Sequence, residues 1–223
     1  HCREADELLS ELASQDAAVV GGDGGISVNR LASLPDSRCQ HLMRYLIRCN
    51  GLQPPGENRL VSGLSALINA PEDGAPELRG EDYCIRRYRD RLWVVPALPE
   101  PVPGRAQQWH PEESLDWFGT TLESRPERGQ GIGRNWCDGL VVTVRVGGER
   151  IEPGPGQAQR ALKKWLQEQV VPPWERQRLP LVWYGDRLVA VADLWIAPVF
   201  RADPGEQGWQ PVWHRPWWLM RSQ

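Results

Sequence analysis

Apolar residues recur at steps of three and four along the N-terminal third of the chain, a pattern typical of amphipathic helices. The pattern predicts a helix over residues 1–20, a second helix with Asp36 as its N-cap that ends near Gly51, and a third over residues 58–70. The second helix is expected to bury Cys39, Leu42, Met43, Leu46 and Ile47, and the third Leu60, Val61, Leu64, Leu67 and Ile68.

The pattern changes after these helices. Residues 83–95 alternate apolar and polar positions and predict a β-hairpin that turns near Asp90-Arg91. Residues 96–104 read PALPEPVPG, a stiff connector, so we place a domain boundary there: a mainly helical domain over 1–95 closed by the hairpin, and a mixed domain over 96–223. The second domain is expected to contain a strand over residues 140–146 and a hairpin through Gly185-Asp186 in addition to a helix. The predicted fold class is therefore α+β.

One predicted helix in the second domain separates its charges from its apolar residues. Its apolar stripe is formed by Ala158, Ala161, Leu162, Trp165 and Leu166, and its opposite face carries Arg160, Lys163, Lys164 and Gln167. Pro172-Pro173 is expected to end the helix, and Arg176 and Arg178 follow it. The pattern alone leaves two interpretations open: a solvated charged face, which is the commoner case, or a surface that binds a nucleic acid.

The order of residues around this helix is specific. Leu162-Lys163-Lys164 is followed by Val171-Pro172-Pro173-Trp174, Arg176, Pro180-Leu181, Tyr184-Gly185-Asp186 and Leu188-Val189-Ala190-Val191. This block resembles the C-terminal domain of bacterial tRNA(Ile)-lysidine synthetase. Earlier segments resemble the central domain of that family, in the right order: Arg44-Tyr45-Leu46, Asn50-Gly51, Pro54-Pro55, Ile85-Arg86-Arg87-Tyr88 and Leu92-Trp93. The chain departs from the family pattern at Ala161, where a cation is usual, and at Asp193, where a glycine is usual.

The resemblance implies a ligase that uses ATP with magnesium to attach lysine to the wobble cytidine of the CAU anticodon of tRNA(Ile). In the family, an N-terminal ATP pyrophosphatase domain with a Ser-Gly-Gly-x-Asp-Ser loop performs this chemistry, and the other domains grip the tRNA. Gly21 to Gly25 (GGDGG) lacks those serines and leads into ISVNRL, expected as a strand, so we interpret it as a turn. We therefore expect a C-terminal fragment without catalytic groups or cofactor of its own.

The resemblance also implies which cations contact RNA. Arg160, Lys163 and Lys164 come first, then Arg176 and Arg178, and then Arg44, Arg86 and Arg87. The expected partners are tRNA(Ile) with the CAU anticodon and the N-terminal catalytic domain of the same protein. The alternative is a structural or dimerisation module that braces the catalytic domain, with a homodimer as a further possible assembly.

Composition agrees with a cytoplasmic globular protein: 40% of the 223 residues are hydrophobic and 25% are charged. No apolar run is long enough to span a membrane. The five cysteines, Cys2, Cys39, Cys49, Cys84 and Cys137, lack C-x-x-C spacing, and the four histidines are widely separated, so no metal site is expected. The net charge of −3 does not exclude RNA binding, because phosphate contacts depend on local potential.

The tryptophans divide into expected core and open cases. Trp165, Trp183 and Trp195 are expected in the core, and Trp213 is expected to complete a strand. Packing is the favoured role for Trp174 because tryptophan is highly buried on average. For Trp217-Trp218 two roles stay open, an adhesive tail or an interface.

Overall fold

The computed structural model describes residues 2–21, 25–71, 74 and 76–220, and of residues 2–6 only the backbone. The chain separates into two compact units. The first contains the residues up to Ala97 and the segment from Pro216 onward, and the second contains Leu98–Arg215. Helices and antiparallel sheets together make the fold α+β, as the sequence predicts. The return of the C-terminal segment to the first unit was not part of that prediction.

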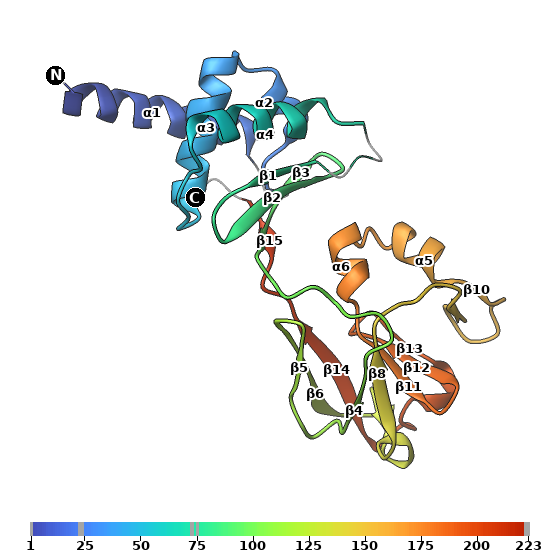
Figure 1. Cartoon of the computed structure of the whole chain (residues 1–223). Coiled ribbons are helices and arrows are strands. Elements are labelled where there is room, and N and C mark those ends of the chain that lie inside the picture. The colour runs from blue at the N-terminus through green and yellow to red at the C-terminus, as the bar shows by residue number, and fades with distance from the viewer. Residues whose placement is uncertain (1, 22–24, 72–73, 75, 221–223) are drawn as a thin grey trace. The chain divides into compact units, whose positions relative to one another are not determined.

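The first unit packs helices on one side of a small antiparallel sheet (Figure 1). Its helices are α1 (Cys2–Val20), α2 (Val28–Ala32), α3 (Asp36–Cys49) and α4 (Glu57–Asn69). Its sheet has the order β1-β2-β3-β15, with β1 (Glu77–Arg79), β2 (Tyr83–Tyr88), β3 (Arg91–Pro96) and β15 (Trp218–Leu219). The predicted hairpin is confirmed as β2 and β3, with Tyr88 paired to Arg91 at the turn.

The predicted helices of this unit are largely confirmed. All five residues assigned to the buried face of α3 are buried. Its C-terminus is also as predicted, because Asn50 is the C-cap and Gly51 follows with a φ of +75°, the left-handed backbone that favours glycine. Two details were wrong: Pro35 and not Asp36 occupies the N-cap position, and Val61 on α4 is 39% exposed.

The segment after Gly25 is a helix where the sequence predicted a strand. Ser27 is the N-cap of α2, and its Oγ accepts a hydrogen bond from the Arg30 N–H. The Asp90 carboxylate accepts from both the Ser27 hydroxyl and the Asn29 N–H. Donors at a helix start thus find acceptors from a hairpin distant in sequence, which a local pattern cannot reveal. Positions 22–24 of the predicted glycine-rich turn lie outside the described residues.

The C-terminal segment completes the sheet of the first unit. Trp218 pairs with Val94 in β3, and its indole N–H donates to Asn50 Oδ1 at 3.0 Å. Trp217 is buried. Trp218 thus belongs to the sheet of this unit although its side chain is 37% exposed, and the two roles that the sequence left open for the pair stay open.

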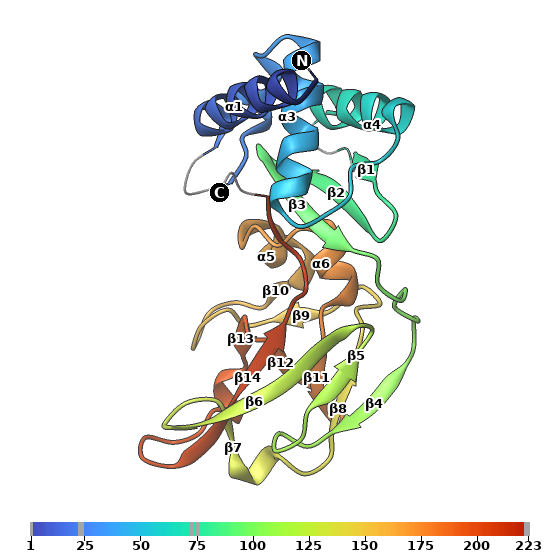
Figure 2. The same ribbon diagram turned by 90° about the vertical axis from the view of Figure 1, so that its left-hand side faces the viewer.

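The second unit contains two larger antiparallel sheets, and its two α-helices lie together at one end of the strands (Figure 2). One sheet has the order β13-β12-β11-β8-β4: Trp195–Ile196, Arg187–Val191, Leu181–Tyr184, Leu140–Thr143 and Ala106–Trp109. The other has the order β5-β6-β14-β7: Leu115–Trp117, Thr120–Arg128, Gln207–His214 and Ile132–Gly133. The pair β9 (Arg150–Ile151) and β10 (Arg160–Ala161), the helices α5 (Leu162–Glu168) and α6 (Pro173–Arg178), and the short helices η1 (Arg134–Trp136) and η2 (Pro198–Phe200) complete the unit.

Candidate nucleic-acid interface

The helix that carries the candidate lysines begins later than predicted. Arg160 and Ala161 form β10, which pairs with Arg150 and Ile151 of β9. The chain turns into α5 only at Leu162, whose N–H donates to the Glu149 carbonyl at 2.9 Å. Ala158 and Ala161 are exposed, so their assignment to an apolar helix stripe was wrong. The β9–β10 pairing overrides the helical pattern at these positions.

The remainder of the amphipathic pattern is confirmed. Leu162, Trp165 and Leu166 are buried, whereas Lys163 and Lys164 are exposed. Neither lysine makes an ion pair with any carboxylate in the part of the chain that the structure describes. The buried side of α5 fixes the helix, and its outer side presents two ammonium groups to solvent.

Arg160 is close to these lysines in sequence, but unlike them it forms an ion pair with a carboxylate. Its Nη1 lies 2.5 Å from Glu168 Oε2 at the end of α5, and the two side chains are 38% and 42% exposed. This ion pair joins β10 to the last residue of α5. The carboxylate offsets the charge of Arg160, so the field at this edge of α5 is weaker than the cation count suggests.

The basic helix ends before the Pro172-Pro173 pair that was expected to end it, and the pair begins another helix. Helix α5 ends at Glu168, and Val170 takes a φ of +61°. Pro173 is then the first residue of α6, where its missing N–H costs no helical hydrogen bond. Trp174 is buried on this helix, so its favoured packing role is confirmed.

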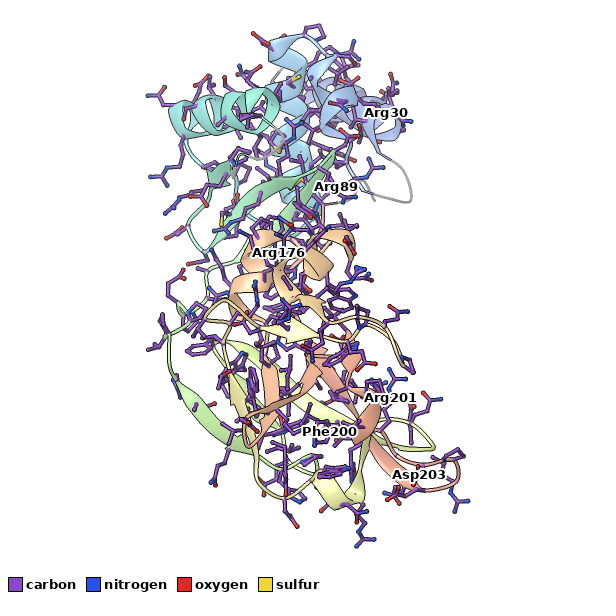
Figure 3. The ribbon with its side chains drawn as sticks, turned by 90° about the vertical axis from the view of Figure 1, so that its right-hand side faces the viewer. Arg30, Arg89, Arg176, Phe200, Arg201 and Asp203 are labelled. Carbon is purple, nitrogen blue, oxygen red and sulfur yellow. The ribbon has the colours of Figure 1, made fainter. Side chains whose placement is uncertain are left out.

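The two arginines of α6 bind backbone carbonyls. Arg178 is 8% exposed, and its guanidinium donates to the carbonyls of Leu98, Pro99 and Phe118. Arg176, labelled in Figure 3, is half-buried, and its Nε donates to the Val171 carbonyl at 2.6 Å. Both arginines therefore hold chain segments together within the second unit.

A partly buried ion network also holds α6 through Glu175. Arg215 bonds Glu175 at 2.8 Å and Asp193 at 2.7 Å. Burial alone would lower the pKa of Arg215, but hydrogen bonds and charge from Asp193 and Glu175 raise it above its ordinary value. Asp193, which departs from the family pattern, thus has an ion-pair partner, and the preceding strand β12 ends at Val191.

The candidate arginines of the first unit have mixed surroundings. Arg87 donates to the Leu67 and Ile68 carbonyls at 3.1 and 2.9 Å, which satisfies acceptors at the end of α4. Arg86 lies 3.3 Å from Glu77. Arg44 is half-buried on α3 and makes no ion pair among the described residues. Arg44 is therefore the candidate of this unit whose charge is least offset.

No group of three or more His, Cys, Asp or Glu side chains in the described segments converges as metal ligands would. Burial, with nearby Asp138 and Glu112, raises the pKa of the Cys137 thiol to about 11, so it remains protonated at neutral pH. No helix among the described residues is long and apolar enough to cross a membrane.

Comparison with known proteins matches each unit separately. Residues 26–93, in the first unit, match the family model of the TilS substrate binding domain, and residues 140–213, in the second, match that of the TilS substrate C-terminal domain. A solved structure titled as the TILS C-terminal domain covers 52% of this chain and 98% of its own, with 20% identity and a TM-score of 0.38.

Proteins named tRNA(Ile)-lysidine synthase match this chain over more than nine tenths of its length. The chain is 38% identical to the protein of Alkalilimnicola ehrlichii over 91% of its length, 33% identical to that of Aromatoleum aromaticum over 96%, and 32% identical to that of Coxiella burnetii over 94%. It spans only 46%, 51% and 47% of those relatives, about half their length.

The two units thus correspond to two substrate domains of one protein family, each matched by its own family model. The chain belongs to the tRNA(Ile)-lysidine synthase family, and it carries the substrate-binding and C-terminal domains of that family.

Proposed function

We propose that this chain is the tRNA-gripping part of an ATP-dependent tRNA(Ile)-lysidine synthase. In this proposal a catalytic domain of the same protein uses ATP with magnesium to attach lysine to the wobble cytidine of the CAU anticodon. The two units described above hold the body of the tRNA while that chemistry proceeds. The names of the relatives and the two domain matches support the assignment.

The observation that carries the proposal is the setting of Lys163 and Lys164. Both side chains are exposed on a helix whose other side is buried, and neither makes an ion pair with a described carboxylate. A-form RNA is read mainly through its phosphates and 2′-hydroxyls, which lysine ammonium groups bind without sequence specificity. A fixed pair of ammonium groups therefore suits the backbone of a tRNA stem.

The other candidates take secondary places for physical reasons. Arg160 contributes positive charge to this surface only when its ion pair with Glu168 is broken. Arg176 and Arg178 donate hydrogen bonds to backbone carbonyls of the protein, so we propose that they stabilise the position of α6 and do not contact the tRNA. Arg44 is retained as the contact in the first unit.

The test compares two charge reversals that change the net charge equally. The Lys163→Glu, Lys164→Glu variant alters α5, and an Arg125→Glu, Arg128→Glu variant alters exposed positions of β6 in the same unit. Binding to a labelled tRNA(Ile) transcript is measured by fluorescence anisotropy at several salt concentrations. We expect the α5 variant to bind about 30-fold more weakly, at roughly 1 kcal/mol per lysine.

The salt dependence adds a second readout. Each phosphate contact contributes roughly 0.7 to 0.9 to the slope of log affinity against log salt, so the α5 variant should lose between one and two slope units. The β6 variant should keep most of the wild-type slope. Equal losses in both variants would show only an effect of net charge. Unchanged binding by the α5 variant would favour the alternative role as a structural brace.

A further inference from the structure

A group of aromatic rings lies apart from α5 and α6, around the β11–β12 hairpin of the second unit. We call Trp136, Tyr184, Phe200 and Arg187 the aromatic cluster. The ring centroids of Trp136 and Tyr184 are 5.4 Å apart, those of Trp136 and Phe200 are 5.0 Å apart, and both pairs meet edge to face. The Arg187 guanidinium carbon lies 4.7 Å from the centroid of the Phe200 ring. Figure 3 marks Phe200, which immediately precedes Arg201 in the chain.

The cluster has a buried base and an accessible outer part. Phe200 is 1% exposed, whereas Trp136 and Tyr184 are only half-buried and Arg187 is exposed. Within the described part of the chain, neither the Trp136 indole N–H nor the Tyr184 hydroxyl makes a hydrogen bond. Other indole N–H groups donate to protein acceptors, namely those of Trp109, Trp117, Trp183, Trp195, Trp213 and Trp218. Two aromatic polar atoms at this surface are therefore available to a ligand.

Strand pairing fixes the backbone of Tyr184, and space remains beside its ring. Tyr184 pairs with Leu140 of β8 and with Arg187 of β12, which fixes its backbone on both sides. A Cβ atom at Gly139 would lie 4.0 Å from Tyr184 Cε2, so the absence of a side chain at this residue leaves that flank of the ring uncovered. Rigid aromatic rings with an open flank bind a flat ligand at low entropic cost.

The charges around the cluster favour a base over a phosphate. Arg134 and Arg187 are exposed and lie within three residues of Trp136 or Tyr184 in the sequence, but so do the exposed Asp138 and Asp186. This mixture gives little net attraction for a phosphate group. Ring faces and a guanidinium plane are, in contrast, the surfaces on which unpaired bases stack in RNA-binding proteins.

We propose that the aromatic cluster stacks one unpaired base of the bound tRNA, with Trp136 and Tyr184 as the contacting rings and Arg187 as the flanking cation. This inference rests on the proposed tRNA-binding function and adds a second kind of contact to it. Lysines of α5 bind the backbone of paired RNA, and the cluster engages a nucleotide outside a helix. The competing explanation is that the rings only pack η1 and η2 against the hairpin.

The test uses the whole chain and the labelled tRNA(Ile) transcript. Trp136→Ala and Tyr184→Ala remove ring surface, Trp136→Phe and Tyr184→Phe keep it, and Trp183→Ala removes a half-buried indole at the neighbouring position. We expect each of the two cluster alanine variants to bind about tenfold more weakly with an unchanged salt slope, because stacking does not release counterions. The phenylalanine variants should stay within about threefold of wild type, since ring faces stack whatever their substituents. Trp183→Ala should stay within the same range, because Trp183 does not belong to the aromatic cluster.

A spectroscopic readout covers the case in which an alanine variant fails to fold. In wild-type chain labelled with 5-fluorotryptophan, the Trp136 resonance is the one missing from the Trp136→Phe spectrum, and added tRNA should shift it. Wild-type tRNA binding together with an unmoved Trp136 resonance, or with equal affinity of folded alanine variants, would overturn the inference and leave the α5 proposal standing. No tRNA binding by wild type would overturn both.

Discussion

Helices α5 and α6 follow one another in the chain and carry two cations each, but they use them in opposite ways. Lys163 and Lys164 on α5 extend into solvent without a carboxylate partner among the described residues. Arg176 and Arg178 on α6 lie against the protein and donate to backbone carbonyls. Cations that look equivalent in the sequence thus divide into groups available for recognition and groups that support the fold.

The residue types account for this division. A guanidinium carries five donors in a planar fork and can satisfy several carbonyls at once, as Arg178 does. An ammonium group is compact and strongly hydrated, so it remains in water unless a partner compensates its desolvation. The difference between the helices can be tested by removing one cation from each.

The largest expected effect is on stability, from Arg178→Ala. The substitution removes the donors of three carbonyls in a nearly buried site and leaves a cavity. We expect the free energy of unfolding to fall by about 3 kcal/mol, in the range for breaking a buried charged group's contacts. Urea denaturation followed by tryptophan fluorescence measures it.

Lys163→Ala is the matched control on α5. Because this side chain is exposed, its loss should change the unfolding free energy by no more than about 0.5 kcal/mol. It should weaken tRNA binding, in contrast to a folded Arg178 variant, whose salt slope should equal that of wild type. Comparable stability losses in the two variants would remove the distinction between the helices.

A smaller effect on stability is expected at Glu149, whose turn contacts the start of α5. Its buried carboxylate accepts hydrogen bonds from the Val146 and Gly147 N–H groups at 2.7 and 2.8 Å, and its carbonyl accepts from Leu162. Burial raises the pKa of Glu149, but these N–H groups and Arg145 outweigh it and lower the pKa below the ordinary 4.5. An ionised carboxylate therefore holds the turn over residues 146–149, and the backbone carbonyl of Glu149 in that turn accepts from the first residue of α5.

The sign of the pH dependence follows from the lowered pKa. The stabilisation by Glu149 is present above its unfolded-state pKa and is lost as pH falls through the lower folded-state pKa. Glu149→Gln should reduce the unfolding free energy by about 1 kcal/mol at neutral pH, and the two chains should converge as pH falls through the lowered folded-state pKa of Glu149. Denaturation curves across this range provide the measurement, and a constant difference at all pH values would refute the carboxylate's role.

The elements that the sequence predicted correctly are those that a local pattern determines. The buried face of α3 and the hairpin turn at Gly185-Asp186 needed only periodicity and turn chemistry. The errors lie where a distant segment supplies the decisive bond: Asp90 at the start of α2 and β9 alongside Arg160. The burial of Leu162, Trp165 and Leu166 was predictable for the same reason as α3. The aromatic cluster was not, since its members come from four separate elements.

The smallest expected effect concerns Arg160, which lies between the two classes of cation. Glu168→Gln removes the carboxylate that pairs with Arg160 and takes one negative charge from the edge of α5. Exposed ion pairs contribute little to folding, so stability should change by no more than about 0.5 kcal/mol, whereas tRNA affinity should rise about two- to threefold. Glu123→Gln, which removes a charge of the same sign from β6, is the control for net charge. If affinity rises in the Glu168 variant alone, Arg160 belongs with the lysines of α5; if it rises equally in both variants or in neither, Arg160 belongs with the supporting arginines of α6.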